Sequence, residues 1–231
     1  MGIVGLIVAF VVVAITLSLW INYRRLKREA YIRAYIFPKG LFVKLRAKHP
    51  TLSIKDCELV ARGLRKFFLV YLRGNRKPVA MPSQVVDDLW HEFILYTRNY
   101  EQFNQKAFGR FLHHTPAAVM GKDRSNNEAL RRTWWQACVE ENINPRTPNR
   151  LPLLFALDTK FNIVEGFRYA TDCSAMRKLG FVQNGTAVQC GGDFSSSSFD
   201  GSTDGFGDSS NDASSDGGAG DGGGGCGGGG D

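Results

Sequence analysis

Two adjacent carboxylates and a histidine stand close together in the segment "VVDDLWHEFILYTRNY", Val85 to Tyr100. Asp87 and Asp88 precede His91 by four and three residues. Residues with these spacings share one face of a helix, so either carboxylate can reach the imidazole. The segment therefore offers the donor atoms of a small polar site.

The imidazoles of His113 and His114 are the other candidates for this group. If two helices fold back on each other near Tyr100, residue 113 lies thirteen positions after the fold and Asp87 lies thirteen before it. The predicted metal site is Asp88, His91 and His113, with Asp87 and His114 as alternates.

Three kinds of role fit such a set of side chains. Mixed carboxylate and imidazole ligands suit a divalent metal such as Zn²⁺, Fe²⁺ or Mn²⁺. An imidazole paired with a carboxylate can instead act as a general base near neutral pH. The structural alternative is an Asp–His pair that joins two helices, with the acidic groups favoured by the helix dipole. The chain has no HExxH or CxxC motif, so the structural pair is the favoured interpretation, ahead of a metal site and of acid–base catalysis, and no catalytic residue is predicted.

The elements that must position these side chains are predicted to be helices. Ser53, with Asp56 three residues later, forms a capping box for a helix that ends at Gly74. A following helix begins with Ser83 as its N-cap and runs to about Arg98, with apolar residues along one face.

Further helices are predicted up to Pro116 and from Ser125 to about Asn142. The segment Leu151 to Tyr169 reads as short extended pieces with a turn near residues 158 and 159, which predicts a small hairpin. The fold class is therefore mainly α, with a possible small β-hairpin.

The first part of the chain predicts a transmembrane helix. Residues 3 to 21 carry no charged side chain, and about 20 apolar residues are needed to cross a bilayer. Basic residues follow this span and none precedes it, which predicts an N-terminus outside and the rest of the chain in the cytoplasm. The predicted membrane-surface residues are Arg24, Arg25, Lys27, Arg28 and Arg33.

Positive charge is concentrated next to the span. The formal net charge of the chain is +7, but residues 22 to 80 hold 16 Lys and Arg against three acidic residues. Anionic lipid headgroups attract such charge by about 1 kcal/mol per residue, so the predicted partner is the inner membrane surface, and nucleic acid is the less favoured alternative.

The end of the chain has a different composition. The last 41 residues contain 16 Gly, 9 Ser and 8 Asp, and such a segment has too little apolar surface to offset the entropy of ordering. We predict a disordered tail that could bind a protein partner or fold back on the basic region. The five cysteines include no CxxC pair and are expected to be free thiols in a cytoplasmic domain.

The predicted organisation has four parts: a transmembrane anchor at 1–23, a basic juxtamembrane segment at 24–43, a compact helical domain at 44–190 and the tail at 191–231. The function predicted from it is a membrane-anchored cytoplasmic binding or scaffolding module. The alternatives are a membrane-tethered metal-binding protein or metalloenzyme that uses the Asp/His cluster, and a nucleic-acid-binding protein.

Three stretches, "VDDLWHEFILYTRNY", "FGRFLHH" and "LPLLFALD", give the chain a resemblance to an uncharacterised glycine-rich domain-containing family. The glycine-rich end, "GGGGCGGGG", also resembles tails of bacterial membrane proteins. Plant members of the family share a segment of the type VDxxWHxHxxxTxxY. The second histidine of that pattern falls at Phe93 here, so a WHxH metal motif is not available to this chain. The resemblance implies a shared domain and no assigned reaction.

Overall fold

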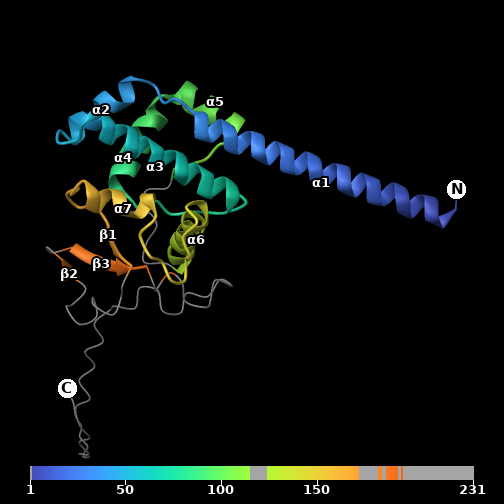
Figure 1. The fold of residues 1–231 in the computed structure, drawn as a ribbon. Coiled ribbons are helices and arrows are strands. Elements are labelled where there is room, and N and C mark those ends of the chain that lie inside the picture. The colour runs from blue at the N-terminus through green and yellow to red at the C-terminus, as the bar shows by residue number, and fades with distance from the viewer. Residues whose placement is uncertain (1, 115–123, 172–181, 184–185, 192–193, 195–231) are drawn as a thin grey trace, which may run out of the picture.

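The computed structural model describes residues 2–114, 124–171, 182–183, 186–191 and 194. Its first element is the helix α1, Ile3–Ala34, which projects from the rest of the structure as a single straight rod (Figure 1). The apolar side chains of its first two thirds are exposed, and among the described residues α1 is the one helix long and apolar enough to span a membrane.

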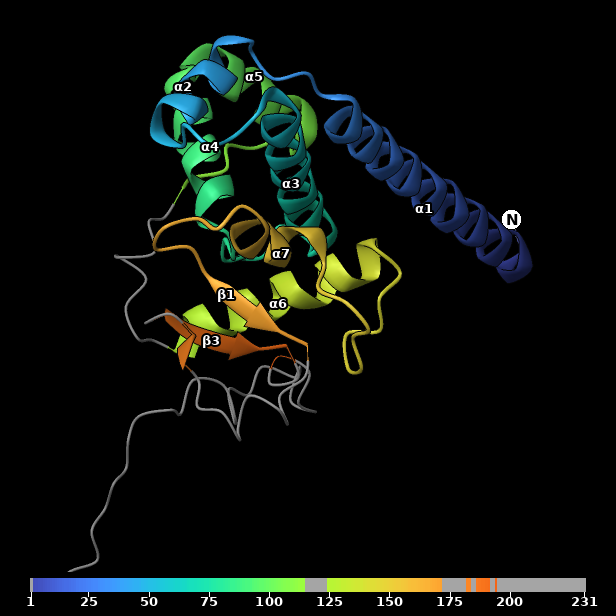
Figure 2. The ribbon, with the colours of Figure 1, turned by 60° about the vertical axis from the view of Figure 1, so that its left-hand side comes forward.

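Of the next four helices, α3 is the longest and the other three pack around it. The four are α2 (Gly40–Lys48), α3 (Ile54–Arg73), α4 (Gln84–Leu95) and α5 (Thr97–Ala107). Figure 2 shows α3 and α5 beside the domain end of α1, with α2 and α4 on the far side of α3. The buried residues of α3 include Phe67 and Phe68, whose rings contact Trp90 of α4.

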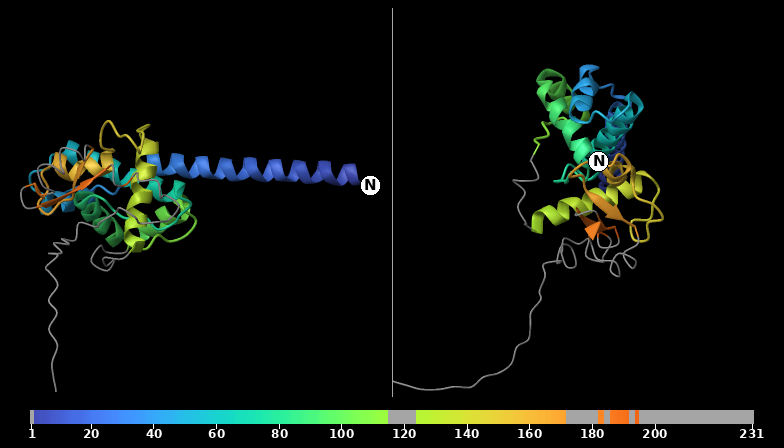
Figure 3. Two further views of the ribbon diagram at one scale, coloured as in Figure 1. Left: turned by 90° about the horizontal axis from the view of Figure 1, so that it is seen from below. Right: turned by 90° about the vertical axis from the view of Figure 1, so that its left-hand side faces the viewer.

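The second half of the domain adds two helices and a small sheet. These elements are α6 (Arg124–Glu140), α7 (Leu153–Lys160), β1 (Arg168–Ala170), β2 (Val182–Gln183) and β3 (Thr186–Cys190). The strand order is β1-β3-β2, with β1 parallel and β2 antiparallel to β3. The sheet lies at the end of the domain away from α2 and α5, next to α6 and α7 (Figures 2 and 3).

The mainly helical fold predicted from the sequence is confirmed. The capping box is present: Ser53 Oγ accepts a hydrogen bond from the Asp56 amide, and the Asp56 carboxylate accepts one from the Ser53 amide. Helix α3 ends at Gly74 and α4 begins after Ser83, as predicted.

The hairpin predicted within Leu151–Tyr169 is wrong, because residues 153–160 form α7. The side chains of Leu154, Phe155, Leu157 and Asp158 are all buried, a spacing that matches one face of a helix. A short apolar run fits a helix and a strand equally well by periodicity, and here packing against α3 selects the helix.

The interior extends into the segment that the sequence assigned to a juxtamembrane linker. Ile32, Phe37 and Leu41 are buried in the same core as the α3 residues. Helix α1 therefore continues without a break from the candidate span into the core of the domain. The predicted tail at 191–231 lies outside the described residues except for Gly191 and Phe194.

Ion pairs hold the inner end of α1 against the domain. Glu29 of α1 accepts a hydrogen bond at 2.7 Å from Arg73 at the end of α3. Arg73 also pairs with Glu140 of α6, which pairs in turn with Arg33 of α1 at 2.6 Å. This network links three helices at the point where α1 enters the domain.

Candidate metal centre

The position of α4 is set by a buried carboxylate from α7. Asp158, 1 % exposed, accepts hydrogen bonds from Ser83 Oγ at 2.7 Å and from the Gln84 and Val85 amides at 2.7 and 3.1 Å. It also accepts one from the Phe167 amide at 2.9 Å. Amides in the first turn of a helix have no partner within the helix, so this acceptor both satisfies them and fixes where α4 starts.

Helix α4 presents Asp87 and His91 on one face, one turn apart. His91 Nδ1 lies 3.4 Å from Asp87 Oδ2 and 3.0 Å from the Asp87 carbonyl oxygen. The neighbouring positions Trp90 and Phe93 point into the core, where Phe93 is fully buried. The residue at the place of the family pattern's second histidine is thus a core residue in this chain.

The third member of the cluster, His114, comes from the segment after α5. This segment is held by two buried polar side chains of α5. The Tyr100 hydroxyl donates to the Leu112 carbonyl at 2.6 Å, and Asn104 Oδ1 accepts from the Leu112 amide at 3.1 Å. Trp90 Nε1 donates to the Tyr100 hydroxyl at 3.2 Å, and its ring lies 4.4 Å from that of His114. The aromatic residue beside His91 therefore positions the other histidine.

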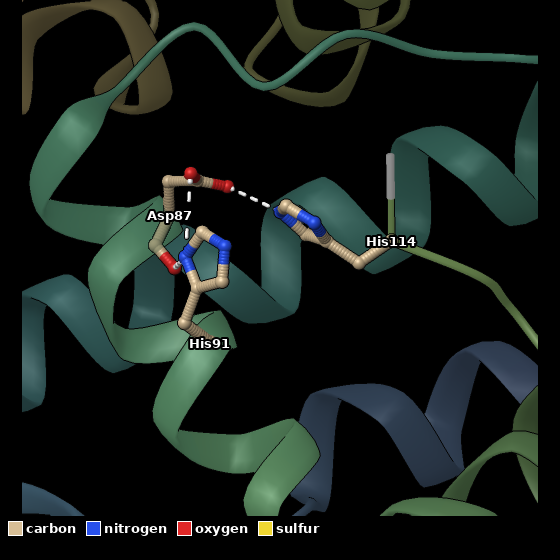
Figure 4. Close-up of side chains that lie close together, drawn as sticks. All are labelled: Asp87, His91 and His114. Carbon is tan, nitrogen blue, oxygen red and sulfur yellow. Dashed lines mark hydrogen bonds and ion pairs between the residues drawn. The ribbon is translucent and has the colours of Figure 1, made fainter. Parts of the chain in front are cut away.

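Asp87, His91 and His114 form one cluster (Figure 4). His114 Nε2 lies 2.9 Å from Asp87 Oδ1, and the two imidazole rings are 4.2 Å apart between centroids. One ligand atom from each residue can be chosen so that all three lie within 4.8 Å of one another. The side chain of His91 is 47 % exposed, and those of Asp87 and His114 are 17 % and 10 % exposed.

The structure thus brings His91 together with Asp87 and His114, the residues predicted as alternates, and not with Asp88 and His113. Asp88 is buried on another face of α4, where it pairs with Lys48 Nζ at 2.6 Å and His49 Nε2 at 2.7 Å. His113 is exposed, with its ring beside that of Phe111.

Asp88 has a structural role. Burial alone would raise the pKa of its carboxyl, but hydrogen bonds from Lys48, His49 and Gln84 lower that pKa below the ordinary value. The carboxylate joins α4 to the end of α2. The sequence pattern does not identify Lys48 and His49 as its partners, because 39 or more residues separate them from Asp88 and no short motif links them. Asp158 was missed as the cap of α4 for the same reason.

The register of the cluster follows from the shape of the segment that carries it. A helix that continues to Pro116, as the sequence predicts, would place His113 level with Asp87. Helix α5 instead ends at Ala107, and Gly109 adopts a positive φ of 71° that only glycine accommodates readily. Residues 110–114 are not helical, and this places His114 opposite Asp87.

The chemistry of the cluster is that of two imidazoles and one carboxylate. Three such ligands suit Zn²⁺ or Fe²⁺ and leave coordination positions for water or a further ligand. With metal–ligand distances of about 2.0 to 2.2 Å, neighbouring ligand atoms lie about 3.3 Å apart in a tetrahedral site. Asp87 Oδ1 lies 2.9 Å from His114 Nε2 and Asp87 Oδ2 lies 3.4 Å from His91 Nδ1, but with one ligand atom from each residue the set spans up to 4.8 Å and would have to tighten around a metal. His91 is the exposed member and can rotate to complete the set.

The predicted membrane-surface residues have three different environments. Arg24 and Lys27 lie over the rings of Trp20 and Tyr23 at 4.6 and 4.7 Å. Arg25 pairs with Glu29 and Arg33 with Glu140, so both belong to the network at the base of α1. The guanidinium of Arg28 lies against Gly109, at the end of α5.

Comparison with known proteins assigns the chain to a family but gives no activity. Neither the curated proteins nor the solved structures gave a match. A family model described as UCP032817-like matches residues 27–194, which include α2 to α7, the inner end of α1 and all three residues of the cluster. The chain therefore belongs to the UCP032817-like family, an uncharacterised family.

Proposed function

We propose that the protein is a membrane-anchored binding module whose cytoplasmic domain holds a divalent transition metal through Asp87, His91 and His114. The observation that carries this proposal is the convergence of two imidazoles and a carboxylate, from α4 and from the segment after α5, within 4.8 Å. The His91 side chain is partly open to solvent. The Asp87 and His114 side chains are mostly buried and are supported by neighbouring buried groups.

The support around the cluster favours a metal over a simple helix contact. A metal site needs ligands whose orientation is fixed by neighbouring groups. His114 is held by the Trp90 ring and by the anchored Leu112 backbone, and Asp87 stands in the first turn of a helix whose start is fixed by Asp158. The two imidazole rings lie 4.2 Å apart between centroids, so one cation could be coordinated by both.

The ligand set favours Zn²⁺, with Fe²⁺ and Mn²⁺ as the other candidates. Imidazole is a common ligand of zinc and iron, and a carboxylate is accepted by all three metals. Three protein ligands leave at least one position open, which permits either a structural water or a reacting molecule at the metal. The open side is the one where His91 is exposed.

The test is metal binding by the full chain in detergent micelles, measured by metal analysis after dialysis and by the visible spectrum with Co²⁺ as a substitute for Zn²⁺. We expect one metal per chain, and a loss of affinity of about a hundredfold or more in His91→Ala, His114→Ala and Asp87→Asn. His113→Ala is the matched control, because His113 is adjacent in sequence but lies outside the cluster.

Two results would overturn the metal proposal. The first is the absence of stoichiometric metal in the wild-type chain under these conditions. The second is an equal loss in His113→Ala and His114→Ala. If His91→Ala and His114→Ala lower the melting temperature of the metal-free chain while the wild type binds no metal, the cluster is a structural link between α4 and the segment after α5.

The orientation in the membrane is part of the same proposal. The basic residues that follow the apolar part of α1 favour an N-terminus outside and a domain in the cytoplasm. Protease added to intact cells should then leave the domain uncut, and permeabilised cells should lose it. Replacing Arg24, Arg25, Lys27 and Arg28 with Gln should increase the fraction with inverted orientation. Digestion of the domain in intact cells contradicts this orientation.

A further inference from the structure

Four arginines from three parts of the chain gather beside the point where α1 meets the domain. Arg24 and Arg28 are one turn apart on the same face of α1. Arg76 lies in the connection between α3 and α4, and Arg110 follows α5. We call these four residues the arginine cluster. It is separate from the candidate metal centre.

Backbone contacts hold the arginine cluster together. Arg76 Nη1 donates to the Phe108 carbonyl at 3.1 Å, and Arg110 donates to the Arg76 carbonyl and, at 2.7 Å, to the Tyr71 hydroxyl. The connection between α3 and α4 and the end of α5 are therefore tied to each other by arginine side chains.

Arg28 joins the cluster by lying against the backbone at Gly109. A Cβ atom added at Gly109 would come 2.6 Å from Nη2 of Arg28. The guanidinium of Arg28 thus occupies the space where a side chain at Gly109 would begin. In agreement with this placement, burial and the nearby charges of Arg76 and Arg24 lower the pKa of Arg28.

None of the four arginines forms an ion pair within the part of the chain that the structure describes. The other two arginines of α1 differ, because Arg25 pairs with Glu29 and Arg33 with Glu140. Like charges held close together repel each other, and a bound anion would remove that repulsion. Arginine is also the side chain best suited to phosphate, which it can bind through two parallel hydrogen bonds.

The arginine cluster lies at the membrane end of the domain, with Arg24 at the depth of the lipid headgroups and Arg28 just beyond it. The uncharged stretch of α1 ends near residue 21, so with a helical rise of 1.5 Å per residue Arg24 and Arg28 lie about 5 and 10 Å beyond it. The headgroup region on each side of a bilayer is about 5 to 8 Å thick. Trp20 and Tyr23, residues of the type that concentrates at the membrane interface, stand just before this level.

We propose that Arg24, Arg28, Arg76 and Arg110 bind the phosphate of an anionic phospholipid headgroup in the leaflet next to the domain. The site rests on the membrane-spanning role of α1 and is independent of the metal centre. It adds residues from two loops far from α1 in sequence to the contact with lipid. The headgroup phosphate would bridge α1 and the two connections and fix the domain against the membrane surface.

The experiment measures lipid preference of the full chain in mixed vesicles of phosphatidylcholine and phosphatidylglycerol. Spin-labelled forms of the two lipids report the fraction of each that is immobilised by the protein. We expect the wild type to prefer phosphatidylglycerol, and Arg76→Gln/Arg110→Gln to lower that preference about tenfold or more. Arg76→Lys/Arg110→Lys keeps the charges and should keep most of the preference.

The matched control is Arg62→Gln/Arg98→Gln, which removes the same charge from exposed positions outside the arginine cluster. An equal loss in this control, or no preference for phosphatidylglycerol in the wild type, overturns the proposal. Displacement of the labelled lipid by millimolar inorganic phosphate also overturns it, because the site would then belong to a soluble anion. Resistance of each variant to extraction from the vesicles with alkaline carbonate is the check that α1 is inserted. Failure of insertion in the wild type contradicts the membrane anchor itself, and the metal centre is tested separately.

Discussion

Neighbouring carboxylates of α4 have different roles because the helix turns their side chains to different faces. Asp87 faces two histidines, whereas Asp88 faces Lys48 and His49 at the end of α2. The same residue type at consecutive positions therefore serves a candidate metal centre in one case and the packing of two helices in the other. Only the tertiary partners distinguish them.

The buried carboxylate of Asp158 provides a prediction for a single residue. Asp158→Ala removes the acceptor for four hydrogen bonds and leaves buried amides of α4 without a partner, so we expect a loss of about 3 kcal/mol in the free energy of unfolding. Urea unfolding followed by circular dichroism measures this loss. Thr159→Ala, at an exposed neighbouring position, is the control, and an equal effect of both substitutions would contradict the capping role.

At the scale of elements, close packing on α3 depends on one glycine. A Cβ atom at Gly63 would lie 2.6 Å from Leu157 of α7 and 3.1 Å from Val86 of α4. Both neighbours are fully buried, so neither can move without repacking. Helices α4 and α7 thus both contact α3 at Gly63, where a larger side chain would clash with them.

Gly63→Ala should destabilise the domain by about 1 to 2 kcal/mol. Overpacking destabilises a core by about 1 to 3 kcal/mol. The higher helix propensity of alanine offsets at most about 1 kcal/mol of this loss. Thermal unfolding in micelles measures the change. Gly5→Ala is a helical control with nothing within 4 Å of the added Cβ, and it should leave the melting temperature of the domain unchanged. A stabilised Gly63→Ala protein would show that the helices can separate at little cost.

The ion pairs between α1 and the domain predict a dependence of stability on pH. The hydrogen bond from Arg73 lowers the pKa of Glu29 below its ordinary value. A lowered pKa stabilises the folded state above the pKa of an unfolded glutamate, about 4.3, and this contribution is lost as the pH falls through the folded value.

Glu29→Gln should therefore lower the melting temperature at neutral pH, and the difference from the wild type should shrink below about pH 4. Melting curves of both proteins across the pH range give this difference directly. Glu58→Gln, at an exposed position on α3, provides the comparison. A difference between wild type and Glu29→Gln that does not change with pH would mean that the ion pair with Arg73 adds nothing to stability.

The elements with local signals were predictable from the sequence, and the contacts between distant elements were not. The capping box at Ser53 and the N-cap at Ser83 lie within a few residues of the groups they bind, so short patterns identify α3 and α4. Helix α7 was predicted as a hairpin because its apolar run is only a few residues long. The correct histidine, His114, depends on the end of α5 at Ala107 and on Gly109, and periodicity does not place either.

At the scale of the whole molecule, α1 is one helix that is both the candidate membrane span and a core element. Its outer part is exposed and apolar, and its inner end buries Ile32 and pairs with α3 and α6. The domain is thus attached to the candidate span by continuous helix, without a linker of irregular structure between residues 3 and 34.

Lys27→Pro should interrupt this connection. Proline removes one hydrogen bond and clashes with the preceding turn, at a cost of about 3 kcal/mol within a helix. We expect faster hydrogen exchange of the α1 amides around residues 23 to 31, with unchanged protection in α3, whose amides lie within the core. Lys27→Ala is the control and should exchange as the wild type does. Faster exchange throughout the domain would mean that α1 is required for the core to fold.

With α1 as the membrane span, its unbroken course would make the orientation of the domain depend on the thickness of the bilayer. A span longer than the hydrocarbon layer tilts to bury its apolar length, so a thinner membrane increases the tilt. Since no flexible joint interrupts residues 3 to 34, that tilt turns the domain as a rigid body. The height of Asp87, His91 and His114 above the lipid would then differ between thin and thick membranes, and so would the molecules that can reach them.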